Sequence, residues 1–255
     1  MEQKRDIHIA VIPDGEKGIT ISKLCGALAT DGTIYKQRKL WNGYPACSYY
    51  FELADEWFDN VKFVSEWISD IINKKGSIKP YKGSFRFRIG SKRLVSYFHS
   101  LGFPYGEKCQ IVKIPEEINN CKEFQKAFIS SALMFDGTIK LDGTVEFSTT
   151  SKKLFDKMVN ILREDGVSIK TYKKRFTRWS SNFKYIFYSK SFSYFLNNLE
   201  GPKKTKLEII RGNRTASIEE LLNLFCIRTQ SKAPVLSELY KKSKSHIQTL
   251  YPLNH

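Results

Sequence analysis

Apolar positions recur at helical spacing in two well-separated stretches of the chain. Residues 19–34 read ITISKLCGALATDGTI and residues 124–139 read FQKAFISSALMFDGTI. In each stretch apolar residues lie three and four positions apart, and each ends in Asp-Gly-Thr-Ile, with Asp31 and Asp136 separated by 105 positions. The pattern predicts two equivalent helices that each end at an aspartate, and it indicates an internal duplication.

The elements that follow each predicted helix are also repeated. Alternating apolar and polar positions predict strands over 48–54, 77–82 and 84–89, and again over 144–148, 167–174 and 183–188. Helical spacing predicts 57–72 and 153–164, and short final helices around 95–98 and 192–195, closed by Gly102 and Gly201. The predicted order is α-β-β-α-β-β-α, twice, which is an α+β fold.

The duplication divides the chain into four parts. We expect a first repeat over 15–112, a linker over 113–122, a second repeat over 123–215 and a helical extension over 216–255. The linker contains Pro115 and the pair Asn119-Asn120, which favour a connecting segment. In the extension, the apolar spacing after Pro234 is compatible with a helix-turn-helix, but packing against the repeats is the favoured interpretation.

The two repeated helices are predicted to pack against each other through small side chains. Each then ends in Asp-Gly, where Gly32 and Gly137 suit a left-handed residue after the helix. A carboxylate at a helix C-terminus opposes the helix dipole, and Asp31 and Asp136 would also repel each other. A shared divalent cation, Mg²⁺ or Mn²⁺, would remove both costs. The expected helix interface comprises Ser22, Gly26, Ala29, Ala127, Ser131 and Met134.

Charge and composition narrow the class of protein. The 255 residues include 42 Lys and Arg against 26 Asp and Glu, for a formal charge of +16, which indicates a polyanionic partner, most simply a nucleic acid. Five cysteines without a CxxC pair predict free thiols, and four histidines without metal-ligand spacing leave carboxylates and lysines as the acids and bases. No apolar run is long enough for a membrane span, and no secretory leader is evident, so we expect an intracellular location, cytoplasmic or organellar.

The segments Leu24–Gly32 and Ile129–Gly137 resemble the two copies of the LAGLIDADG motif. The chain is similar to a single-chain, two-repeat LAGLIDADG homing endonuclease over roughly residues 15–205, with Ser131 in place of the usual glycine. The resemblance implies tandem αββαββα repeats related by a pseudo-twofold axis, each offering an antiparallel sheet to double-stranded DNA. It also implies a monomer that serves intron homing and makes a staggered break in a long asymmetric target, with Asp31 and Asp136 as catalytic metal ligands.

Basic residues beside the acids and on the sheets complete the expected site. Arg88 in the first half and Lys184 in the second are the candidates for stabilising charge beside the metals. Strand alternation places Glu52, Arg86 and other polar residues on the outer face of each sheet, where base edges can be read. The predicted DNA contacts are Lys36, Arg38, Tyr50, Glu52, Arg86, Lys140, Glu146, Lys170, Tyr172 and Lys174.

Two alternatives share these electrostatics. One is an RNA-binding maturase that assists intron splicing on the same scaffold. The other is a non-cleaving regulator that reads DNA with residues 216–255. The presence of both Asp31 and Asp136 favours the nuclease over either alternative.

Overall fold

The computed structural model describes residues 11–41, 44–175, 183–214, 216–217 and 220. The first half forms a four-stranded antiparallel sheet in the order β1-β2-β4-β3. Its elements are α1 (Glu16–Ala29), β1 (Gly32–Trp41), β2 (Tyr44–Asp55), α2 (Phe58–Ile72), β3 (Ser77–Tyr81), β4 (Ser84–Gly90) and α3 (Lys92–Ser100).

The second half repeats this arrangement, with a sheet in the order β5-β6-β8-β7. Its elements are α5 (Lys122–Asp136), β5 (Thr138–Ile139), β6 (Val145–Thr149), α6 (Lys152–Glu164), β7 (Lys170–Arg175), β8 (Phe183–Ser189) and α7 (Phe192–Asn198). A short α4 (Glu116–Asn119) lies in the connection, and α8 (Gly201–Ile210) follows the second repeat. The predicted order of elements, and with it the fold class, is confirmed.

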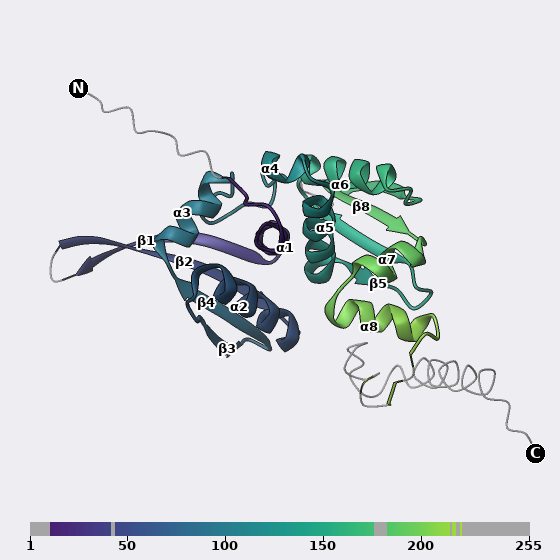
Figure 1. The fold of residues 1–255 in the computed structure, drawn as a ribbon, viewed down its shortest axis with the longest axis horizontal. Coiled ribbons are helices and arrows are strands. Elements are labelled where there is room, and N and C mark those ends of the chain that lie inside the picture. The colour runs from purple at the N-terminus through teal and green to yellow at the C-terminus, as the bar shows by residue number, and fades with distance from the viewer. Residues whose placement is uncertain (1–10, 42–43, 176–182, 215, 218–219, 221–255) are drawn as a thin grey trace, which may run out of the picture.

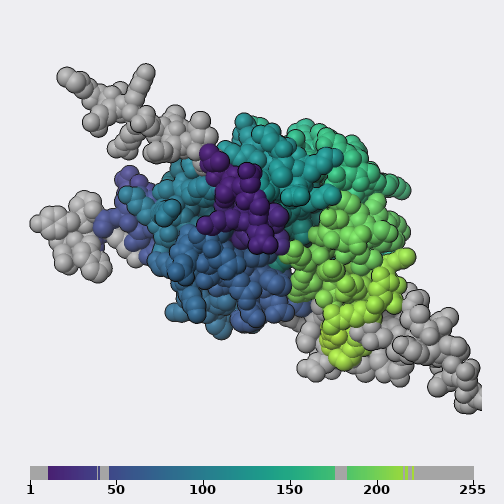
Figure 2. Space-filling model, in the orientation of Figure 1, coloured from purple at the N-terminus to yellow at the C-terminus, as the bar shows by residue number. Residues whose placement is uncertain are grey.

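The two halves lie side by side, with α1 and α5 facing each other at the junction (Figure 1). In the space-filling view the halves meet without a break, and the first described residues, in purple, lie along the junction (Figure 2). Helices cover one face of each sheet, and buried phenylalanines fill the space between them. Equivalent strands each supply a buried ring: Phe51 and Phe87 in the first half, and Phe147 and Phe187 in the second.

Local sequence sets where several elements begin. Ser91 and Ser151 are N-cap residues, and their side chains accept hydrogen bonds from the amides of Leu94 (3.2 Å) and Leu154 (3.3 Å). The first hairpin is long and projects beyond the helices (Figure 1). The second is short because Gly143, with a φ of 80°, turns the chain directly after Lys140.

The expected roles of three glycines were wrong. Gly201 begins α8 with a φ of 64° and does not close α7, which ends at an extended Leu199. Gly32 and Gly137 are not left-handed, and Gly137 has a φ of −70°. A Cβ on Gly137 would lie 2.3 Å from the carbonyl oxygen of Leu133, so close approach, not left-handed backbone, requires glycine there.

Two further expectations meet the described residues only in part. The predicted extension over 216–255 lies outside them, except for residues 216, 217 and 220. Cys25, Cys47, Cys109 and Cys121 are free thiols. Within the described ranges, no helix is long and apolar enough to cross a membrane.

Candidate active site at the ends of the paired helices

Close packing of α1 against α5 fixes the centre of the molecule. A Cβ on Gly26 would lie 2.3 Å from the carbonyl oxygen of Phe128 and 2.9 Å from Cβ of Ser131, so only glycine allows this approach. The Oγ of Ser131 is buried and has no hydrogen-bond partner among the described residues. The six residues expected at the helix interface are all buried: Ser22, Gly26, Ala29, Ala127, Ser131 and Met134.

The packed helices bring two acids together at their C-terminal ends. Asp31 follows α1 directly after Thr30, whose Oγ1 donates to the carbonyl oxygens of Gly26 (3.0 Å) and Ala27 (3.1 Å). Asp136 is the last residue of α5. Both side chains reach solvent, but protein surrounds them on most sides. Burial, the charge of Asp136 and the charge of Asp55 raise the pKa of Asp31 to about 7, and burial raises the pKa of Asp136.

Two half-buried lysines that sequence reasoning missed flank the acids. Lys108 Nζ donates to the carbonyl oxygens of Leu28 and Gly32 at the end of α1. Lys203 Nζ donates to the carbonyl oxygen of Phe135 at the end of α5 (2.5 Å). Burial lowers the pKa of each lysine to about 8, against the opposing effect of the nearby carboxylates. The feature of the sequence that could have indicated these two lysines is the presence of a basic residue soon after the final helix of each repeat.

The first half also holds the last turn of α5 in the second half. Asp55, buried at the end of β2, accepts hydrogen bonds from the amide of Trp57 (2.6 Å) and from Nδ2 of Asn60 (3.2 Å). The same Asn60 Nδ2 donates to the carbonyl oxygen of Met134 (3.4 Å). The last turn before Asp136 is therefore bound at successive carbonyls by Asn60 and by Lys203.

Two small cavities border Asp136. One, of about 230 Å³, is also lined by Thr30, Lys108, Lys184 and residues 148–150. The other, of about 280 Å³, is lined by Glu56, Trp57, Lys203 and Lys206. Lys184, predicted from the sequence, therefore lies beside an acid, and its charge lowers the pKa of Asp136.

Arg88, the basic residue predicted beside the metals in the first half, lies on β4. It pairs across the sheet with Glu52, and its guanidinium stacks on Tyr50 with 3.9 Å between Cζ and the ring centre. Its side chain therefore belongs to the outer face of the first sheet, with Glu52, Arg86 and Tyr50.

The strand registers sort the other predicted contacts by face. On the second sheet, the outer face carries Lys140, Glu146, Lys170, Tyr172, Lys174 and Lys184. On the first sheet, Lys36 and Arg38 alternate with Tyr35 and so lie on the opposite side from Tyr50 and Glu52. They share the side of buried Ile34 and Phe51, and Lys36 Nζ is 5.6 Å from the Tyr49 ring centre.

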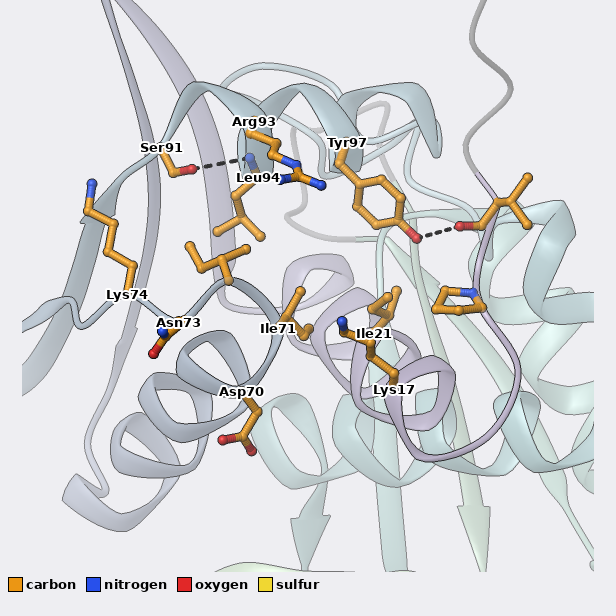
Figure 3. A pocket seen from close by; sticks show the side chains of 13 residues that line it. Lys17, Ile21, Asp70, Ile71, Asn73, Lys74, Ser91, Arg93, Leu94 and Tyr97 are labelled. Atoms are coloured by element: carbon orange, nitrogen blue, oxygen red, sulfur yellow. Dashed lines mark hydrogen bonds between the residues drawn. The ribbon is translucent and has the colours of Figure 1, made fainter.

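A larger cavity, of about 750 Å³, lies at the other end of α1 (Figure 3). Lys17 and Ile21 of α1, Asp70 at the end of α2, and Arg93 and Tyr97 of α3 line it. The hydroxyl of Tyr97 donates to the carbonyl oxygen of Val11 (3.0 Å), which ties the first described residue to α3. The cavity is remote from Asp31 and Asp136 and takes no part in the site they form.

The fold and the paired acids define a class: the chain has the fold of the LAGLIDADG homing endonucleases. No protein-family model matches the sequence, and no curated protein matches it significantly. Among solved structures, I-DmoI in complex with DNA and Mn matches with a TM-score of 0.56 and 18% identity, covering 72% of this chain and 96% of that chain. I-LtrWI bound to target DNA matches with a TM-score of 0.55 and 14% identity, covering 90% of this chain and 98% of that chain.

Proposed function

We propose that this protein is a site-specific DNA endonuclease that uses a divalent cation to hydrolyse one phosphodiester on each strand of a long, asymmetric target. One observation carries the proposal. Two carboxylates, Asp31 and Asp136, meet at the ends of two tightly packed helices, with Lys108 and Lys203 beside them. The structural neighbours support it, because I-DmoI and I-LtrWI are homing endonucleases seen with DNA.

The residues at this centre suit a divalent cation. The described residues include no group of three or more His, Cys, Asp or Glu side chains that could hold a metal ion. Asp31 and Asp136 offer two carboxylates, and the two cavities beside Asp136 provide space for water and phosphate oxygens, which is the ligand set that Mg²⁺ prefers. A bound divalent cation would supply positive charge to the phosphodiester and lower the pKa of a bound water. Asp31 and Asp136 would hold it, and its charge would relieve their repulsion.

In the proposed reaction, Lys108 and Lys203 stabilise negative charge on the phosphate. Lys108 and Lys203 are anchored on backbone carbonyls, so their ammonium groups are fixed before DNA binds. Fixed positive charge in a partly desolvated site stabilises the negative charge that develops as water attacks the phosphorus. Lys184 adds charge on the side of the second sheet. The basic outer face of that sheet, with Lys170 and Lys174, would bind the DNA backbone.

The test is cleavage of a randomised DNA library by the wild-type protein and by Asp31→Asn, with Mg²⁺ and with Ca²⁺. We expect cutting at one long site in Mg²⁺ and none by the variant, which should still bind that site in Ca²⁺. DNA binding by the wild type with no cutting in Mg²⁺ or Mn²⁺ would contradict the proposal. Cutting by Asp31→Asn at the wild-type rate would contradict the role of the acids.

A further inference from the structure

Five side chains on the outer face of the first sheet form a connected group, which we call the Tyr–Arg–Glu cluster: Tyr35, Tyr50, Glu52, Arg86 and Arg88. Tyr35 donates a hydrogen bond to Glu52 Oε2 (3.0 Å). Arg86 Nη1 lies 3.6 Å from Glu52 Oε1, and Arg88 Nε lies 3.7 Å from Oε2. One carboxylate thus orients two guanidinium groups.

Aromatic rings fix the arginines from the other side. Arg88 Cζ lies 3.9 Å from the centre of the Tyr50 ring and 5.5 Å from that of Tyr35. Arg86 Cζ lies 4.2 Å from the ring centre of Tyr81 on β3. A guanidinium held by stacking and by a carboxylate has lost most of its rotamer freedom before any ligand binds. Binding therefore loses less conformational entropy when the side chain is ordered.

The exposed part of the Arg88 side chain indicates what kind of ligand the Tyr–Arg–Glu cluster would bind. Its Nε is buried without a hydrogen bond, whereas 34% of the side chain is exposed. The two Nη groups are therefore the donors available to a partner. A planar pair of donors matches a partner with two adjacent acceptors, and guanine offers O6 and N7 in the major groove.

The second sheet carries a different set at the equivalent positions. Glu146 pairs with Thr138 across the strands, just as Glu52 pairs with Thr33 in the first sheet. Lys140 Nζ lies 3.0 Å from the Glu146 carboxylate. Tyr188 stands opposite Glu146, where Arg88 stands opposite Glu52, and Ile186 takes the place of Arg86. The outer face of the described strands β5 to β8 therefore offers ammonium groups and no guanidinium.

We propose that the Tyr–Arg–Glu cluster makes the first sheet the guanine-reading half of the protein, with Arg88 as the residue that contacts guanine and Glu52 as its positioning residue. The second sheet binds its half-site through lysines and discriminates less between bases. The inference rests on the proposed function and deepens it, because it states which half of the asymmetric target carries the stricter requirement.

The experiment compares base preferences of variants selected on the same randomised library, by binding in Ca²⁺ and by cleavage in Mg²⁺. Arg88→Lys keeps the charge and removes the paired donors. We expect it to lower the preference for guanine at one or two adjacent positions by about 10- to 100-fold and to leave the other positions unchanged. Lys170→Met, on the second sheet, is the matched control, and it should weaken binding to all sequences alike.

The positioning role has its own pair of variants. Glu52→Gln should broaden the base preference in the same half-site as Arg88→Lys, while Glu146→Gln should act on the opposite half-site. Equal weakening by Arg88→Lys across all sequences, or a lost preference for a base other than guanine, would overturn the proposal. Because binding is read separately from cutting, a protein that binds but does not cut would refute only the nuclease. A protein that does not bind DNA would refute both.

Discussion

The paired acids should cost the protein stability when no metal is bound. Burial and the neighbouring carboxylates raise the pKa of Asp31 to about 7 from an ordinary value of 3.8. At about 1.4 kcal/mol for each unit, an ionised Asp31 would cost at most about 4 kcal/mol. Because the side chain reaches solvent, screening reduces this cost, and we expect Asp31→Asn to stabilise the metal-free protein by about 1–2 kcal/mol at pH 8.

The sign of the effect follows from the two protonation states. The unfolded chain loses the Asp31 proton near its ordinary pKa, whereas the folded protein keeps it up to a pKa of about 7. Well below pH 4 both states are protonated and the carboxylate costs nothing. The cost grows as the pH rises from about 4 to about 7 and is constant above that. The gain from Asp31→Asn should follow the same curve.

The measurement is urea unfolding of the wild type, Asp31→Asn and Asp136→Asn at pH 4, 6 and 8 in a chelator, then at pH 8 with Mg²⁺. We expect equal stability at pH 4, a more stable Asp31→Asn at pH 8, and stabilisation by Mg²⁺ of the wild type alone. If Asp31→Asn is no more stable than the wild type at pH 8, burial and the neighbouring carboxylates do not destabilise the ionised Asp31. A gain of the same size at pH 4 and pH 8 would show that the effect is not electrostatic.

Four other substitutions test the site and the packing around it. Lys108→Met and Lys203→Met should each lower the single-turnover cleavage rate by about 100-fold while DNA affinity in Ca²⁺ changes little, and a matching loss of affinity would assign these lysines to binding instead. Gly26→Val should destabilise the protein by about 1–3 kcal/mol in chemical unfolding, because its Cβ would collide with the Phe128 carbonyl; an unchanged midpoint would show that the helices can separate at no cost. Ser151→Ala should lower the free energy of unfolding by about 1–2 kcal/mol, because the hydroxyl caps α6 and also donates to the carbonyl oxygen of Val112 (2.5 Å). Ser91→Ala, at the equivalent cap of α3, is the comparison.

The parts of the site that follow local periodicity could be predicted from the sequence. The duplication placed Asp31 and Asp136 at equivalent helix ends, and the structure has them there. Alternation with a period of two placed Glu52, Arg86 and Arg88 on one face of the first sheet, which the strand pairing reproduces. Lys36 and Arg38 were chosen for their closeness to the motif instead. Two and four positions beyond buried Ile34, they share its side of the sheet, so alternation already argued against grouping them with Glu52.

The rest depends on contacts between segments far apart in sequence. Lys108 lies in the segment that follows α3, and no periodicity marks it; only the return of the chain to the end of α1 places it against the Leu28 and Gly32 carbonyls. Asn60 is a polar residue in the first turn of α2, and its binding to Met134 requires the two halves to be docked. Charge counting could not separate these residues from the many other polar side chains.

The structure also shows where the two repeats were free to diverge. At the centre, Gly26 packs closely against the backbone of α5, and the charge of Asp136 raises the pKa of Asp31, so a change in one helix affects both halves. The sheets are less constrained, because in the described residues the main helix contacts of each sheet are with helices of its own half. Accordingly the first sheet has a long hairpin and two arginines around Glu52, while the second has a two-residue β5 and one lysine at Glu146. The proposed cleavage of an asymmetric target would use this division: similar chemistry for both strands at the centre, and different sheet faces for two different half-sites.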